Sequence, residues 1–141
     1  MNSEPQAQSL CLQNRYIIAV VREQKIAFLS ELVSETIAID KRKILTLPMY
    51  DRSVFGVVHD RGNIIPLIAW NSKEQTIGTK LVKETLIAIR LSHLAGDLEG
   101  VGILVDRAIG TLDREQIEAS DEEIKIWEIN HISQEIWRAK R

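Results

Sequence analysis

Residues 55–70 read FGVVHDRGNIIPLIAW, an apolar run that is interrupted at its centre by His59, Asp60, Arg61 and Gly62. Two apolar runs separated by charged residues and a glycine are typical of two β-strands joined by a tight turn. The polar side chains at the turn allow three interpretations. They form a catalytic centre, they are ordinary hairpin residues, or they are a charged recognition site on a rigid β scaffold.

Short apolar runs of the same kind recur along the chain, separated by polar turns. From Arg15 onward two β-rich runs flank a charged turn, and residues 29–39 (LSELVSETIAI) indicate a helical turn that passes into a strand. ILTLP is expected to be a short extended segment that stops at Pro48, and the other expected strands are LIAIRL, VGILVDRAIGTL with a kink near Gly110, and IKIWEI. AGDLEG is expected to form a hairpin turn, DREQIEASDEE an acidic connection, and ISQEIWRAK a short C-terminal helix. About seven short strands with little helix predict a mainly all-β sandwich or barrel.

The length and charge of the chain limit the classes of protein that it can belong to. Its 141 residues are enough for one domain, or for two small lobes that share a core. Residues 1–14 are polar and are expected to form a flexible lead-in. The net charge of −2 provides no strong basic field, which argues against a nucleic-acid partner. Cys11 is the single cysteine, and neither a signal peptide nor a membrane-length apolar run is present. The sequence therefore predicts a soluble, cytoplasmic protein without membrane insertion.

Residue patterns that carry catalysis or bind metals are not found. The histidines at 59, 93 and 131 lack metal-ligand spacing, and there is no Walker loop, nucleophile elbow or dinucleotide fingerprint. Asp60 and Asp106 are the best candidates for a catalytic carboxylate pair, but turn and strand-end roles explain them better. The tryptophans at 70, 127 and 137 end apolar runs, so core packing explains them better than base stacking. We expect no enzyme activity, no metal and no cofactor.

Glu35 and Arg61 are ionisable residues inside apolar segments. In a strand over VSETIAI, Glu35 shares a face with Val33 and Ile37. A carboxylate on a half-buried face costs several kcal/mol unless it is paired, and Arg61 has the same difficulty within its own run. Either the two side chains form a charge-assisted pair, or Glu35 is exposed and Arg61 is a turn residue.

The order of these segments resembles CheW-like domains, the adaptor family that couples chemotaxis receptors to their histidine kinase. The resemblance covers about residues 15–115 and resumes at the final strand. YIIAVVREQKIAFLSELVSE resembles the opening hairpin, turn and Val-x-Glu of the family. LTLPMYDRSVFGVVHDRGNIIPLI resembles its Leu-Pro, spacer and Gly-Val-x-x-x-Arg-Gly-x-x-x-Pro core, and VGILVDRAIGTL its Val-Gly-x-x-Val-Asp-x-Val strand.

The resemblance implies a single domain over residues 15–141, made of two small SH3-like five-stranded β barrels that share a core. In the family, the motif arginine and the early glutamate pair with one another and border the partner-binding surface. The matching positions are Arg61 and Glu35. Gly56 and Gly62 match the glycines that flank the segment, and Val33 matches an apolar residue at the edge of the groove for kinase and receptor. The resemblance thus favours the Glu35–Arg61 pair.

The sequence departs from the family pattern in three places. His59 and Asp60 replace a common Asn-Leu, and Ala69 stands where the family often has Asp. The family also has a longer passage, with an additional strand, where this chain has only DREQIEASDEE. This difference leaves open whether the second barrel lacks a strand. If it does, the edge of its sheet is either exposed or covered by the C-terminal tail. His59 and Asp60 receive no role.

The resemblance implies a non-enzymatic adaptor that couples a chemoreceptor to a CheA-type histidine kinase in chemotaxis or motility. The expected partners are the regulatory domain of the kinase and the cytoplasmic tip of a methyl-accepting receptor. The alternative is a divergent CheW-like regulator of pilus-based motility, or a decoy that caps array growth with reduced partner binding.

Overall fold

The computed structural model describes residues 15–46, 54–69 and 84–129. Nine strands, three short 3-10 turns and one short helix are present in these ranges. The elements in chain order are β1 (Arg15–Val21), β2 (Gln24–Leu29), η1 (Ser30–Leu32), β3 (Val33–Asp40), η2 (Lys41–Lys43), β4 (Val54–Asp60), β5 (Asn63–Ala69), β6 (Thr85–Leu91), η4 (His93–Leu98), β7 (Gly102–Val105), β8 (Arg107–Asp113), α3 (Arg114–Glu118) and β9 (Ile124–Ile126).

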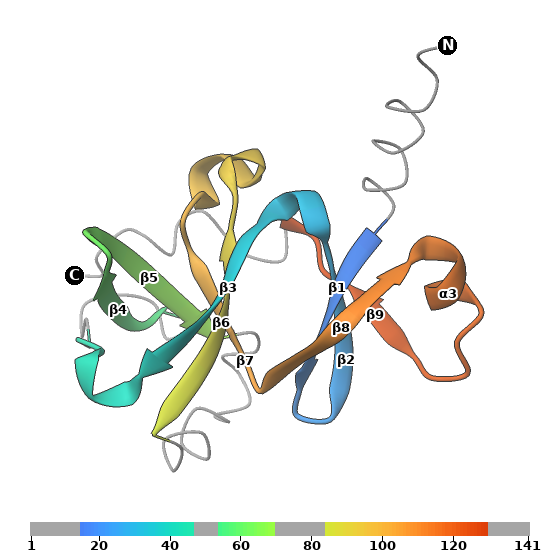
Figure 1. Cartoon of the computed structure of the whole chain (residues 1–141), viewed down its shortest axis with the longest axis horizontal. Helices are drawn as coiled ribbons and strands as arrows, with labels where there is room; N and C mark the ends of the chain where they lie inside the picture. Colours follow the sequence, from blue (N-terminus) through green and yellow to red (C-terminus); the bar gives the residue numbers. More distant parts are fainter. Residues whose placement is uncertain (1–14, 47–53, 70–83, 130–141) are drawn as a thin grey trace, which may run out of the picture.

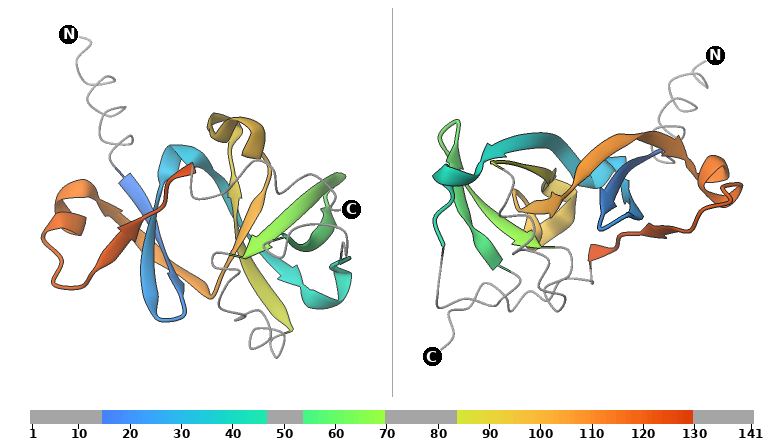
Figure 2. Two further views of the ribbon diagram at one scale, coloured as in Figure 1. Left: turned by 180° about the vertical axis from the view of Figure 1, so that it is seen from behind. Right: turned by 90° about the horizontal axis from the view of Figure 1, so that it is seen from below.

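The strands form two sheets that lie side by side (Figures 1 and 2). One sheet has five strands in the order β3-β6-β7-β5-β4, and the other has four in the order β8-β1-β2-β9. The five-stranded sheet curls until the chain after β3 reaches β4, where Leu45 and Val57 exchange two backbone hydrogen bonds of 2.8 Å. The mainly all-β, two-barrel architecture predicted from the sequence is confirmed.

Many of the apolar strands are buried on both faces because each sheet lies between two hydrophobic cores. In β1, Ala19 and Val21 point to a core shared by the two sheets, whereas Tyr16 and Ile18 point to the interior of the four-stranded sheet. In β6, Ile89 and Leu91 face the shared core and Leu86 and Ala88 face the interior of the other sheet. This explains why YIIAVV and LIAIRL are nearly continuous apolar runs instead of alternating ones.

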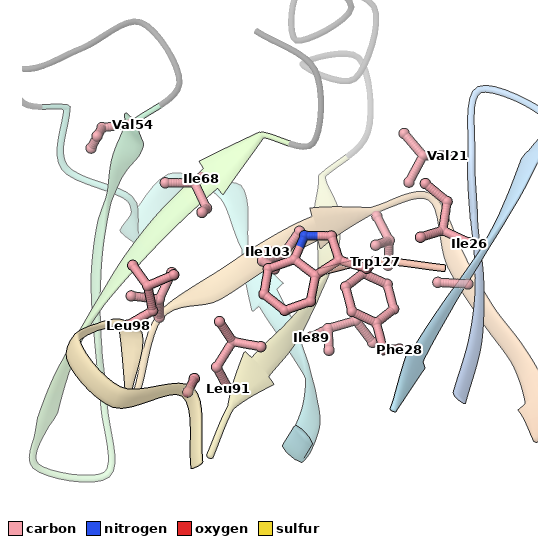
Figure 3. Packing of buried hydrophobic residues seen from close by; sticks show 14 residues of the cluster. Val21, Ile26, Phe28, Val54, Ile68, Ile89, Leu91, Leu98, Ile103 and Trp127 are labelled. Carbon is pink, nitrogen blue, oxygen red and sulfur yellow. The ribbon is translucent and has the colours of Figure 1, made fainter. Parts of the chain in front are cut away.

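Trp127 lies in the shared core, directly after β9 (Figure 3). It is 2% exposed, and its ring packs against Phe28 of β2 at a centroid distance of 5.4 Å. Its backbone N–H donates to Ala27 O, which fixes the chain end of β9 against β2. The prediction of core packing for this tryptophan is confirmed. Trp70 and Trp137 lie outside the described residues.

Two tight hairpin turns match the sequence prediction. Arg22 and Glu23 join β1 to β2, and Arg61 and Gly62 join β4 to β5. All four residues have positive φ, between 51° and 83°. Positive φ at both central residues is the feature of the type I′ turn, whose twist fits two-residue hairpins.

The charged segment after β3 is a 3-10 turn, η2, that is capped by Asp40. The Asp40 carboxylate accepts hydrogen bonds from the Arg42 backbone N–H at 2.9 Å and from its guanidinium at 2.8 and 3.1 Å. These bonds lower the pKa of Asp40 to about 2. The turn therefore keeps its cap ionised at neutral pH.

The structure corrects several expectations for the second half of the chain. The segment VGILVDRAIGTL is not one kinked strand, since it divides at Asp106 into β7 and β8, which belong to different sheets. AGDLEG lies largely in the 3-10 segment η4, although the strands that it connects, β6 and β7, do pair antiparallel. DREQIEASDEE contains α3, which begins with a capping box between Asp113 and Gln116.

The four-stranded sheet is the one that carries the shortened connection. It contains β8 and β9 and has one strand fewer than the other sheet in the described part of the chain. Ile117 of α3 is buried with Tyr16, Ile18 and Ala27, so the helix covers one side of this small core. The expected lead-in over residues 1–14 and the expected C-terminal helix lie outside the described residues.

Gly56 is required by a close approach of two backbones. A Cβ at this position would lie 2.5 Å from Leu45 O and 2.8 Å from the Ile44 side chain. The replacement Gly56→Ala must therefore displace the segment that closes the five-stranded barrel. We expect a loss of about 1–3 kcal/mol in the free energy of unfolding, measured by urea denaturation.

Gly62→Asn is the matched control for this prediction. Gly62 has a φ of 83°, which asparagine tolerates, and a Cβ there would have no neighbour within 4 Å. We expect a change of less than about 0.5 kcal/mol. Equal destabilisation by the two variants would contradict the role given to Gly56.

Candidate functional site

The candidate site is an ion-pair network beside the β4–β5 turn. Glu35 on β3 accepts a hydrogen bond from Arg61 Nη2 to its Oε1 at 2.7 Å and one from Arg90 Nη1 to its Oε2 at 3.0 Å. Arg61 also donates from Nε to Asp60 Oδ2 at 3.2 Å. Two carboxylates and two guanidinium groups thus form a chain with no net charge.

The backbone explains why these groups meet. Glu35 and Arg90 are direct cross-strand neighbours in the β3–β6 pair, so their side chains leave the sheet on the same face. Arg61 belongs to the turn that ends β4, and its positive φ of 51° aims the chain back along the sheet. The carboxylate therefore lies between two arginines that are 29 positions apart in the sequence.

The predicted Glu35–Arg61 pair is present. Glu35 lies on the half-buried face of β3 as expected, whereas the expected burial of Arg61 is wrong. The Arg61 side chain is 69% exposed, and the Glu35 side chain is 30% exposed. Arg90 is the most covered member, with 21% of its side chain exposed. Arg61 is thus a turn residue and an ion-pair partner at once, because the turn projects beyond the sheet into solvent.

Sequence reasoning missed Arg90. The signal was a single arginine within the otherwise apolar strand LIAIRL, in which a charged residue needs a partner. Its partner could not be chosen without the β3–β6 register. The sequence predicts a catalytic carboxylate or a turn residue at Asp60, and the structure places it as the outer member of the network, bound to Arg61.

The other expected site residues have different environments. Gly62 is exposed beside Arg61, as the second residue of the turn. Gly56 is buried beneath Leu45 and offers no surface to a partner in this structure. Val33 is half-buried at the start of β3 and packs against the shared core. The structure therefore brings Glu35, Arg61 and Gly62 together. Val33 precedes Glu35 on the same strand, as the first residue of β3.

A groove of about 480 Å³ borders the network. Its walls come from the start of β3, the β4–β5 hairpin and the β6–η4–β7 connection. Ile64 on its rim is 69% exposed, so it adds an apolar side chain to a border that is otherwise largely polar. The lining residues are Ser34, Asn63, Ile64, Arg90, Leu91, Ser92, His93, Glu99 and Gly100.

The electrostatics of the network favour fixed charges over proton transfer. The two arginines lower the pKa of Glu35, and the hydrogen bond from Arg90 contributes more than that from Arg61. Glu35 and Asp60 raise the pKa of the Arg61 guanidinium. A general base must accept a proton near neutral pH, whereas these pKa directions keep Glu35 and Arg61 charged across that range.

The two candidate catalytic aspartates have structural partners. Asp60 binds Arg61, and the Asp106 carboxylate accepts a 2.6 Å hydrogen bond from the Arg22 backbone N–H in the β1–β2 turn. Within the described ranges, no group of three or more His, Cys, Asp or Glu side chains is placed to hold a metal ion. None of the helices in the described part of the chain has the length and apolar character needed to span a bilayer.

Comparison with known proteins finds likeness at the level of structure. No protein-family model matches the sequence, and no curated protein sequence matches it. A solved structure, the scaffolding protein TtCheW from Thermoanaerobacter tengcongensis, has 17% sequence identity and a TM-score of 0.57. The match covers 86% of this chain and 92% of that one. The chain therefore has the fold of a CheW scaffold protein.

The order of the two contributions to the Glu35 pKa gives a testable prediction. We expect Arg90→Gln to move the pKa of Glu35 further back toward its ordinary value than Arg61→Gln does. The reason is that the hydrogen bond from Arg90 is the largest single cause of the lowered pKa, and Arg90 is more shielded from solvent than Arg61. Titration of the Glu35 carboxyl by NMR measures both shifts. A larger effect of Arg61→Gln would contradict this order.

The lowered pKa also sets the sign of a pH dependence. A carboxylate whose pKa is lower in the folded state stabilises the fold above its unfolded pKa, and that stabilisation is lost as pH falls. We expect the free energy of unfolding, measured by urea denaturation, to decrease as the pH falls below about 4.3. We expect Glu35→Gln to remove part of this decrease. An unchanged profile in Glu35→Gln would contradict the prediction.

Proposed function

We propose that this protein is a non-enzymatic adaptor that couples a chemoreceptor to a CheA-type histidine kinase. The observation that carries the proposal is the Glu35–Arg61 pair on a fold like that of a CheW scaffold protein. The partners would be the regulatory domain of the kinase and the cytoplasmic tip of a methyl-accepting receptor. The protein would work in the cytoplasm as one domain of two β lobes over residues 15–141.

The network supports a role in fixing the register of a protein–protein contact. Glu35 has both oxygens bound to arginines, so its side chain is held in one position before a partner arrives. Arg61 is largely exposed and retains guanidinium surface for a partner. Preorganised charges of this kind give specificity more than affinity.

Apolar area for the contact would come from Ile64 more than from Val33. Ile64 is exposed on the rim of the groove, two residues after Gly62, whereas Val33 is half-buried against the shared core. An exposed aliphatic residue ringed by polar groups is the usual arrangement of an interface centre. We therefore assign the first contact to the β4–β5 turn, with Glu35, Arg61 and Gly62, and give Val33 and Gly56 supporting roles.

A pull-down with the cognate kinase tests the proposal. We expect Arg61→Glu to weaken kinase binding by about tenfold or more, because it places three acidic side chains together. The variant should still fold, since the Arg61 side chain is largely exposed. Arg42→Glu, which makes the same change of charge at η2, is the matched control and should bind like the wild type.

Each outcome of this experiment has a distinct meaning. Equal weakening by Arg61→Glu and Arg42→Glu would contradict the site and leave the adaptor role standing. Failure of the wild-type protein to bind either kinase or receptor would contradict the adaptor role itself. A charge swap of residues 35 and 61 is a poor test here, because an arginine at position 35 would face Arg90.

A second candidate function is favoured by the four-stranded sheet. A CheW-like regulator with one reduced lobe would engage a partner on one side only, and so would cap the growth of an array or serve pilus-based motility. Neighbouring genes for pilus motors would support this role, and receptor and kinase genes would support the first. In reconstituted arrays, a capping protein would shorten the arrays as its concentration rises.

A further inference from the structure

β8 is an edge strand with an open side. It pairs with β1 and lies at the end of the order β8-β1-β2-β9, so no other strand in the described part of the chain pairs with its outer side. It runs from the junction of the two lobes to α3 at the far end of the molecule (Figure 1). An edge strand presents backbone N–H and C=O groups that can bind another strand.

The side chains of β8 are also uncovered. Its residues from Arg107 to Thr111 are all exposed, although a strand that covers a core normally alternates between buried and exposed. The adjacent strand β1 has five buried residues out of seven. Ile109 is 47% exposed, and it is one of four large apolar side chains that are exposed among the described residues.

The middle of β8 has room for a second backbone. The register with β1 shifts between Ile18 and Ala19, which leaves Ile109 without an opposite residue. Gly110 follows with a φ of 149°, and a Cβ built there would meet no atom within 4 Å. Glycine within a strand often marks a bulge or a place where another backbone comes close.

The charges at the two ends of β8 are complementary under antiparallel pairing. Arg107 begins the strand and Asp113 ends it. If two copies of β8 pair antiparallel, Arg107 of each lies beside Asp113 of the other, whereas parallel pairing would place like charges together. The net charge of −2 adds little repulsion between two copies.

We propose that β8 is a self-association edge, at which a second copy of this chain binds antiparallel across a two-fold axis near Gly110. The two four-stranded sheets then form one continuous sheet, and the two Ile109 side chains lie near the axis. A contact of this kind is isologous, because each copy uses the same residues. It does not depend on the proposed adaptor role.

A second copy fits this edge better than an unrelated strand. Protected edges commonly carry lysine, proline or a strong bulge, and β8 has the bulge but neither lysine nor proline. A second β8 that runs antiparallel places its Asp113 beside Arg107 and its Arg107 beside Asp113. An unrelated strand would not carry these matching charges except by chance. One seven-residue edge buries little area, so we expect a weak dimer with a micromolar or higher dissociation constant.

Analytical ultracentrifugation of the whole protein tests the association. We expect a dimer that dissociates on dilution, and Ile109→Lys should raise its dissociation constant by about tenfold or more. Leu94→Lys is the matched control and should leave the dimer unchanged. Leu94 is an exposed apolar residue on η4, which connects β6 and β7 of the other sheet. Circular dichroism confirms that both variants fold.

Three results would overturn the proposal. They are a protein that stays monomeric at about 1 mM, a dimer equally strong in Ile109→Lys, and equal weakening by Leu94→Lys. Binding of the kinase by Ile109→Lys should match the wild type, so failure of this proposal is distinct from failure of the adaptor role.

The antiparallel register has its own test in a double-mutant cycle. Arg107→Glu should weaken the dimer strongly because it places Glu beside Asp113 of the other copy. Asp113→Asn removes that charge and keeps a good N-cap for α3. In the Asp113→Asn background, Arg107→Glu should weaken the dimer several-fold less. Additive effects would overturn the pairing of Arg107 with Asp113.

Discussion

The fold depends on a hydrophobic core that two curved sheets share. The strands at this core must be apolar on both faces, because one face lies on the shared core and the other on the interior of their own sheet. Trp127 fills the junction, and its backbone bond to Ala27 ties β9 to β2. Charged groups are excluded from this double-sided interior, so the few that occur in apolar runs must lie where a strand or turn reaches the rim.

Glu35, Arg61 and Arg90 are such groups, and the register of the sheet decides how they meet. β3 is buried on one face from Ile37 onward, while its first half reaches the edge of the core, where the Glu35 carboxylate is partly accessible. Arg90 lies opposite on β6 and supplies the shielded contact. Arg61 closes the network from the exposed turn. A site built in this way holds its carboxylate between two arginines without a buried charge.

The residue pattern was sufficient to predict the strand-rich fold and the two tight turns, whereas it left the pairing of Glu35 with Arg61 open, and only the resemblance to CheW-like domains favoured that pair. The residue pattern was not sufficient for features that depend on long-range register. The break at Asp106 separates two strands of similar composition, and only their assignment to different sheets reveals it. In the sequence, Arg90 is a single charge in an apolar strand. Its partner Glu35 is identified only by the pairing of β6 with β3. The exposure of Arg61 was mispredicted because local hydrophobicity does not show how far a hairpin extends beyond a sheet.

In the described part of the chain, a short helix lies between β8 and β9 of the four-stranded sheet. A capping box between Asp113 and Gln116 starts α3 immediately after β8, and the helix then places Ile117 over the small core beside Tyr16. A five-residue helix covers apolar side chains but offers no ladder of backbone groups to a neighbouring strand. The core is therefore closed while the edge of β8 stays open. Covering a core and pairing an edge are separate requirements of a β barrel. Within the described residues, α3 covers the small core of this lobe, whereas the edge of β8 has no strand partner and is left to a second copy in the proposed dimer.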